Sequence, residues 1–127
     1  MSAARPTSSP KVARLLQEAV ALHQSGQLEA AETSYRRVLK HNSREPDALH
    51  LLGVVRGQRG DAREGETLIK RAIAVRDDFP AAHMNLALIL WRNLGNLLEA
   101  EHHVRRALRY QPTPANYDQL GNLLCAR

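Results

Sequence analysis

The residues that could perform chemistry are few in this sequence, and their spacing does not suit it. Cys125 is the single cysteine, which excludes an internal disulfide and any multi-cysteine metal site. His102 and His103 are adjacent, so on a helix their side chains point about 100° apart and do not bind one metal ion as a pair. The sequence also holds no His-Glu-x-x-His motif, glycine-rich phosphate loop or Gly-x-Ser-x-Gly motif. We therefore expect a binding module and not an enzyme, with no metal and no cofactor.

The composition indicates one helical domain. Of the 127 residues, 43% are hydrophobic and 4% are aromatic, so Leu, Ala, Val and Ile must fill the core. Strands would need more aromatic and β-branched residues. Residues 1–10 are polar and lack periodicity, so we expect a flexible lead there and one domain over residues 11–127. Because the sequence lacks the apolar stretch of a signal peptide or a membrane span, we expect a soluble, cytoplasmic protein.

Basic pairs recur along the chain, whose net charge is +5. They occupy residues 36–37, 70–71 and 105–106, spaced by 34 and then 35 residues. An aligned basic stripe could contact nucleic acid, an anionic membrane or an acidic neighbouring domain. The alternative is a solvated helix face, because glutamates lie close by and no aromatic residues are interleaved for stacking on bases. We favour the solvated face and do not expect nucleic acid as a partner.

A period of 34 residues organises the sequence. Pro46, Pro80 and Pro114 follow one another at intervals of 34 residues. Six residues after each proline comes Leu, followed by Gly or Ala. Glycines at matching positions mark turns, the last of them one residue late in the period. Between these marks the apolar residues recur at helical spacing. The pattern predicts seven helices, at residues 11–24, 28–41, 47–58, 62–76, 80–93, 97–110 and 115–126.

A short motif repeats in the first helix of each pair: a large residue, two spacers, Leu and a small residue. Its copies are Leu49-x-x-Leu52-Gly53, His83-x-x-Leu86-Ala87 and Tyr117-x-x-Leu120-Gly121. With this motif and period the chain resembles the tetratricopeptide repeat family, although Arg56 and Leu90 replace an expected tyrosine. The resemblance implies an all-α, right-handed α-solenoid of antiparallel helix pairs. Its units would be a degenerate one at 12–45, then 46–79 and 80–113, with a capping or truncated helix at 114–127.

The resemblance also implies that the first helices line a concave groove and that the second helices face outward. One inward row, Gln17, Leu51, Asn85 and Gln119, carries an amide at three of its four positions, and amides can bind a peptide backbone. Solvated polar side chains are the alternative interpretation of this row. The complete set of predicted groove residues is Gln17, Val20, Gln24, His50, Leu51, Val54, Gln58, Met84, Asn85, Leu88, Trp91, Arg92 and Gln119.

The primary prediction is a non-enzymatic adaptor that binds a peptide or helical segment of a partner protein in this groove. Asn85 is similar to one rung of the asparagine ladder in sugar-transferring family members, so the second hypothesis is the acceptor-recognition arm of a larger glycosyltransferase or sulfotransferase. A third is a self-associating scaffold. The chaperone-binding clamp of the family is disfavoured, because its positions hold Leu16, Val20, Leu51, Ala81 and Asn85.

Overall fold

The computed structural model describes residues 9–126, and that stretch contains helices and no strand. Each predicted helix is present, and every bound agrees within one residue. Residues 1–8 of the predicted flexible lead lie outside the described part, and the first helix already begins at Pro10, with the Ser9 hydroxyl accepting a hydrogen bond from the Val12 amide. The helices are α1 (Pro10–Gln24), α2 (Leu28–His41), α3 (Pro46–Gln58), α4 (Ala62–Val75), α5 (Pro80–Arg92), α6 (Leu97–Tyr110) and α7 (Pro114–Ala126).

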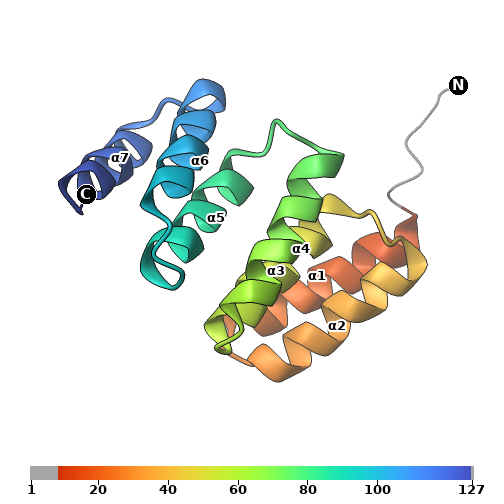
Figure 1. Ribbon diagram of the computed structural model, residues 1–127. Coiled ribbons are helices and arrows are strands. Elements are labelled where there is room, and N and C mark those ends of the chain that lie inside the picture. The colour runs from red at the N-terminus through yellow and green to blue at the C-terminus, as the bar shows by residue number, and fades with distance from the viewer. Residues whose placement is uncertain (1–8, 127) are drawn as a thin grey trace, which may run out of the picture.

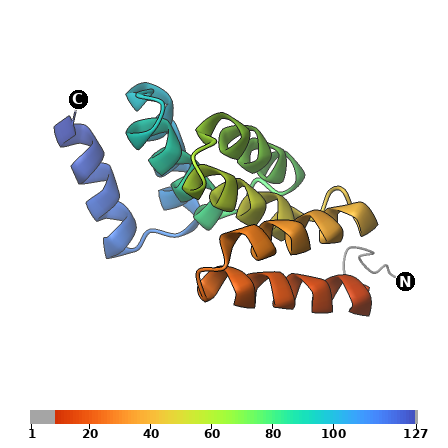
Figure 2. The ribbon, with the colours of Figure 1, turned by 90° about the horizontal axis from the view of Figure 1, so that it is seen from below.

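The helices form an open stack of antiparallel pairs (Figure 1). α1 packs against α2, α3 against α4 and α5 against α6, and each pair then packs on the next. α7 adds to α6 at the far end, so the two ends of the described chain lie at opposite ends of the stack (Figure 2). This arrangement confirms the predicted all-α solenoid of helix pairs. The division into repeat units remains a prediction.

The helix starts explain the periodic prolines. Pro10, Pro46 and Pro80 occupy the first turn of α1, α3 and α5, where a missing amide N–H costs nothing and the fixed φ favours the helix. Two of the second helices begin differently, with polar caps. The Asp61 carboxylate accepts from the Glu64 amide at α4, and the Asn96 side chain accepts from the Glu99 amide at α6.

The three turn glycines lie in the turns that connect the two helices of each pair, as predicted. Gly26, Gly60 and Gly95 have φ values of +83°, +100° and +69°, a conformation that other residues rarely adopt. The late position of Gly95 reflects one additional residue in its turn, which spans residues 93–96, whereas the preceding turn spans residues 59–61. The additional residue lengthens the turn and leaves α6 at its full length.

The closest helix contact in the core is between α3 and α4. A Cβ atom added to Gly53 would lie 2.6 Å from Cγ1 of Ile69 and 2.9 Å from the carbonyl oxygen of Gly65. The second of these is a backbone atom that cannot rotate away. Leu52 and Ile69, which flank this contact, are completely buried. Gly121 has the same place in the repeat on α7, yet a Cβ atom there would meet nothing within 4 Å.

Arg56, which stands where the family has tyrosine, joins three helices through charge. Its guanidinium contacts Glu32 of α2 at 3.2 Å, Glu64 of α4 at 2.7 Å and Asp61 at 3.1 Å. Arg59 adds a second contact to Glu32 at 2.8 Å. These carboxylates raise the pKa of Arg56, chiefly through the hydrogen bonds that Arg56 donates to Asp61 and Glu32. Ion pairs between side chains therefore contribute to the contact between the first two helix pairs.

None of the helices in residues 9–126 combines the length and the apolar character that crossing a lipid bilayer requires.

Gly53→Ala tests the α3–α4 contact. We expect this change to lower the free energy of unfolding by about 1–3 kcal/mol, because the new methyl group would overpack against backbone. Gly121→Ala is the matched control at the equivalent repeat position, and it should leave stability unchanged or raise it by up to about 1 kcal/mol through helix propensity. Urea unfolding followed by circular dichroism measures both. Equal effects from the two changes would contradict the close approach.

Candidate functional site

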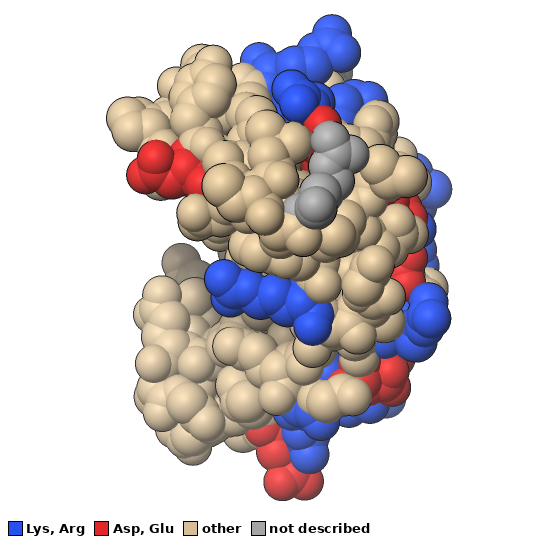
Figure 3. Space-filling view, turned by 60° about the vertical axis from the view of Figure 1, so that its left-hand side comes forward, with Lys and Arg blue, Asp and Glu red and all other residues tan. Residues whose placement is uncertain are grey.

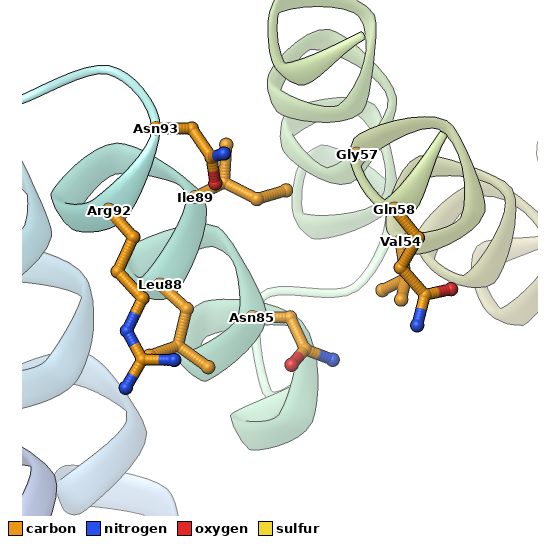
Figure 4. Close-up of a pocket in the computed structure, with 8 residues that line it drawn as sticks. All are labelled: Val54, Gly57, Gln58, Asn85, Leu88, Ile89, Arg92 and Asn93. Carbon is orange, nitrogen blue, oxygen red and sulfur yellow. The ribbon is translucent and has the colours of Figure 1, made fainter. Parts of the chain in front are cut away.

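A hollow of about 360 Å³ lies between α3 and α5, the first helices of neighbouring pairs (Figure 4). It opens to solvent and lies on one side of the stack. Five of its lining residues are among the predicted groove residues, whereas Gly57, Ile89 and Asn93 are not. The complete lining is Val54, Gly57, Gln58, Asn85, Leu88, Ile89, Arg92 and Asn93.

The floor of the hollow is apolar. Val54 on α3 and Leu88 on α5 are both half-buried. Gly57 has no side chain, so Ile89 can approach the α3 backbone there. The Cδ1 atom of Ile89 would lie 3.3 Å from a Cβ atom added at Gly57. A partner's side chain could therefore contact both helices and remove apolar surface from water.

The amide of Asn85 is oriented by a buried histidine. Its Nδ2 atom lies 2.8 Å from Nε2 of His50 and donates to it. His50 is 4% exposed and packs edge-on against Phe79, with 4.9 Å between the ring centres. Burial lowers the pKa of His50 to about 4, so near neutral pH the ring is uncharged and can accept this bond. The Asn85 oxygen is then left as an acceptor on the face of α5, and in Figure 4 it points away from α3.

His23 orients the amide of Gln58, but here the amide oxygen contacts the ring, whereas in Asn85 the NH₂ group does. The Oε1 atom of Gln58 accepts from Nε2 of His23 at 2.9 Å, which leaves Nδ1 of His23 to accept from the Tyr35 hydroxyl at 3.1 Å. Tyr35 is completely buried, and burial raises its pKa to about 12, so its hydroxyl keeps the proton that it donates. The free group of Gln58 is its NH₂, a donor. Asn85 and Gln58 thus give the hollow one oriented amide acceptor and one oriented amide donor, and Asn93 adds a third amide to its lining.

The remaining predicted groove residues do not line this hollow. His50 lies behind Asn85 and acts through it, because the packing of α3 against Phe79 covers the ring. Trp91 is half-buried, with the Arg92 guanidinium 5.2 Å from its ring centre. Among the others, Gln17 and Gln24 on α1 are exposed. The rest are half-buried, namely Val20, Leu51, Met84 and Gln119. Of the predicted amide row, the hollow takes in Asn85 alone.

The basic pairs lie among carboxylates. Arg36 contacts Glu32 and Glu64 at 3.1 and 3.5 Å, and Lys70 contacts Glu66 and Glu99, each at 2.8 Å. Arg106 pairs with Asp77. Figure 3 shows charges of both signs gathered on the side away from the indentation, whose walls are mostly uncharged. These contacts favour the solvated-face interpretation of the basic pairs.

One buried contact was missed by the sequence analysis, which considered His103 only beside His102. Nδ1 of His83 on α5 lies 3.0 Å from Nδ1 of His103 on α6, and both rings are buried. Nε2 of His83 donates to the carbonyl oxygen of Asp77 at 3.0 Å, so its Nδ1 must accept from His103. Burial lowers the pKa of both rings, that of His103 to about 4. The pair ties the segment before α5 to α6.

A model of the tetratricopeptide repeat matches residues 16–56 and 50–117. The chain belongs to the tetratricopeptide repeat family. Domains of this family are typically non-catalytic modules that bind other proteins. No curated protein sequence is similar enough to match it.

Solved tetratricopeptide repeat structures share the fold. The first such domain of Spaghetti (RPAP3), bound to the HSP90 peptide SRMEEVD, superposes with a TM-score of 0.86 at 17% identity, over 94% of each chain. The Yersinia enterocolitica type III secretion chaperone SycD, in complex with a peptide of the translocator YopD, gives 0.77 at 19% identity, over 96% of this chain and 92% of that one. A Thermobaculum terrenum O-GlcNAc transferase mutant gives 0.86 at 27% identity, over 96% of this chain but 23% of the transferase.

We expect the stability of the protein to fall as the pH drops from about 6.5 toward 4. His50 and His103 have pKa values of about 4 in the folded chain and an ordinary value of 6.5, so the unfolded chain takes up protons first and is favoured as the pH falls. Thermal unfolding between pH 7.5 and 4 measures the effect. His50→Gln keeps an acceptor for Asn85 but cannot titrate, so its decline should be shallower. An identical decline in parent and variant would remove His50 from the explanation.

Proposed function

We propose that this chain is a non-enzymatic interaction module that binds an extended or helical segment of a partner protein in the groove between its first helices. The observation that carries the proposal is the hollow between α3 and α5, which combines an apolar floor with two amides of opposite hydrogen-bonding sense. No lining residue is a nucleophile, an acid or a base. The composition and the single cysteine favour the cytoplasm as its location.

The two oriented amides match what a peptide backbone offers. An extended segment presents N–H and C=O groups in turn, so the free oxygen of Asn85 can accept from the partner and the NH₂ of Gln58 can donate to it. Each such bond contributes about 0.5–1.5 kcal/mol net, too little to hold a peptide alone. Contact with Val54 and Leu88 must add the rest, through apolar area removed from water.

Two similarly folded proteins support a peptide ligand. The Spaghetti domain holds an HSP90 peptide and SycD holds a YopD peptide. Their identities to this chain, 17% and 19%, support a shared fold and not a shared partner. The partner of this chain must therefore be read from its own groove residues.

A second candidate is the acceptor-recognition arm of a larger transferase that modifies proteins with a sugar or a sulfo group. The O-GlcNAc transferase favours it, because this chain is similar to 23% of that enzyme at 27% identity. In this reading the same groove would present the acceptor segment. The deciding observation is the reading frame of the gene: a catalytic domain encoded after Arg127 would support the arm.

Self-association is a third candidate, favoured by apolar exposure at one end of the stack. Tyr117 and Leu124 on α7 are 56% and 39% exposed, beside the uncovered Gly121. If this face joins two copies, sedimentation of the parent should show a dimer that grows with concentration. Tyr117→Glu combined with Leu124→Glu should then give only monomer. A parent that stays monomeric throughout would exclude this candidate.

The groove proposal is tested by placing charge on its floor. Peptides are first selected from a displayed library on the parent protein, and their affinities are measured by fluorescence anisotropy. We expect Val54→Asp, Asn85→Asp and Leu88→Asp together to weaken binding at least tenfold, because they put carboxylates where apolar and amide groups meet the peptide. Arg37→Glu and Lys40→Glu on α2 are the control. Circular dichroism verifies folding, and unchanged binding by the folded groove variant would rule the groove out.

A further inference from the structure

The hollow has a single charged lining residue, Arg92. It is the last residue of α5, its side chain is exposed, and in Figure 4 it lies beside Leu88 at the edge of the hollow. Among residues 9–126 no carboxylate lies within ion-pair distance of its guanidinium, and its one recorded neighbour is the Trp91 ring at 5.2 Å. A cation at the edge of an apolar surface is thus left without a counter-charge.

Two other arginines differ in this respect, Arg56 on α3 and Arg59 directly after that helix. Arg56 and Arg59 both contact Glu32, so their charge is largely compensated within the fold. The hollow itself contains no acidic residue. The full charge among its lining residues is therefore positive, and the group that would pair with it is an anion from the partner. A guanidinium offers a planar fork of donors that matches a carboxylate in particular.

The spacing of Leu88 and Arg92 restricts where that carboxylate sits in the partner. The two residues are one helical turn apart on α5, a rise of about 6 Å. In an extended peptide, side chains on one face recur every second residue, about 6.6–6.8 Å apart. An apolar side chain over Leu88 and an acidic one at Arg92 are thus two residues apart in the partner.

We propose that the groove selects an internal, extended segment with an aliphatic side chain for the hollow and an Asp or Glu two residues away for Arg92. This inference rests on the proposed function and specifies its ligand. The segment runs along α5, where it meets Leu88 and Arg92 in turn, and the hollow is open to solvent. A bound segment can continue in both directions.

The test uses acetylated and amidated nonapeptides in a positional-scanning library, so that no peptide has a terminal carboxylate. The full 127-residue protein should select an aliphatic residue at one position and Asp or Glu two positions away. Replacing that acidic residue by Gln should weaken binding about tenfold. Arg92→Glu should remove the acidic preference and select Lys or Arg there instead. Arg71→Glu is the matched control, because Arg71 is an exposed helical arginine in a different hollow, on α4.

The outcomes separate this inference from the function on which it rests. Binding without acidic preference would overturn the role of Arg92 and leave the groove proposal standing. A preference abolished by Arg71→Glu and not by Arg92→Glu would move the site to α4. A parallel library with free C-termini is measured beside the amidated one, and binding confined to that library would replace the side-chain carboxylate by a terminal one. No binding by any peptide would overturn both proposals.

Discussion

The contact between Gly53 and Gly65 is the constraint on which the site depends. Two backbones meet where no side chain fits, and this fixes how α3 is turned against α4. One turn further along the same face of α3, Gly57 allows Ile89 of α5 to approach, with the Cδ1 atom of Ile89 3.3 Å from where a Cβ atom of residue 57 would lie. The hollow is therefore a product of helix packing and needs no loop to form it.

Behind the groove, His50 and His23 orient the side-chain amides of Asn85 and Gln58. His50 is buried where a charged ring would be costly, and its uncharged state is what allows it to accept from Asn85. His23 holds Gln58 in the opposite hydrogen-bonding sense, because Oε1 of Gln58 accepts from Nε2 of His23, while the Tyr35 hydroxyl contacts Nδ1 of the same ring. Side chains that would otherwise rotate freely are thus held before any ligand arrives, which reduces the entropy that binding must offset.

The sequence predicted the elements well because proline and glycine impose strict local geometry. Prolines at the helix starts and Gly26, Gly60 and Gly95 at the turns located the helices within a residue. The family resemblance also implied Val54 and Leu88 as groove residues, and both line the hollow. Periodicity could not show that His50 is covered, because this depends on side-chain rotamers. It could not show that His83 meets His103 either, because these residues are 20 positions apart in the chain and lie on different helices. Periodicity gives the face of a helix but not its partner.

The substitution of Arg56 for an aromatic residue makes the joints of the stack chemically unequal. The seam between the first two helix pairs contains a cluster of opposite charges, which dissolved salt screens. The third helix pair is joined internally by two uncharged imidazoles, those of His83 on α5 and His103 on α6, which acid protonates. A rise in ionic strength would weaken the ion pairs at the first joint, whereas acidification would weaken the contact within the third pair, so different surroundings act on different parts of the array.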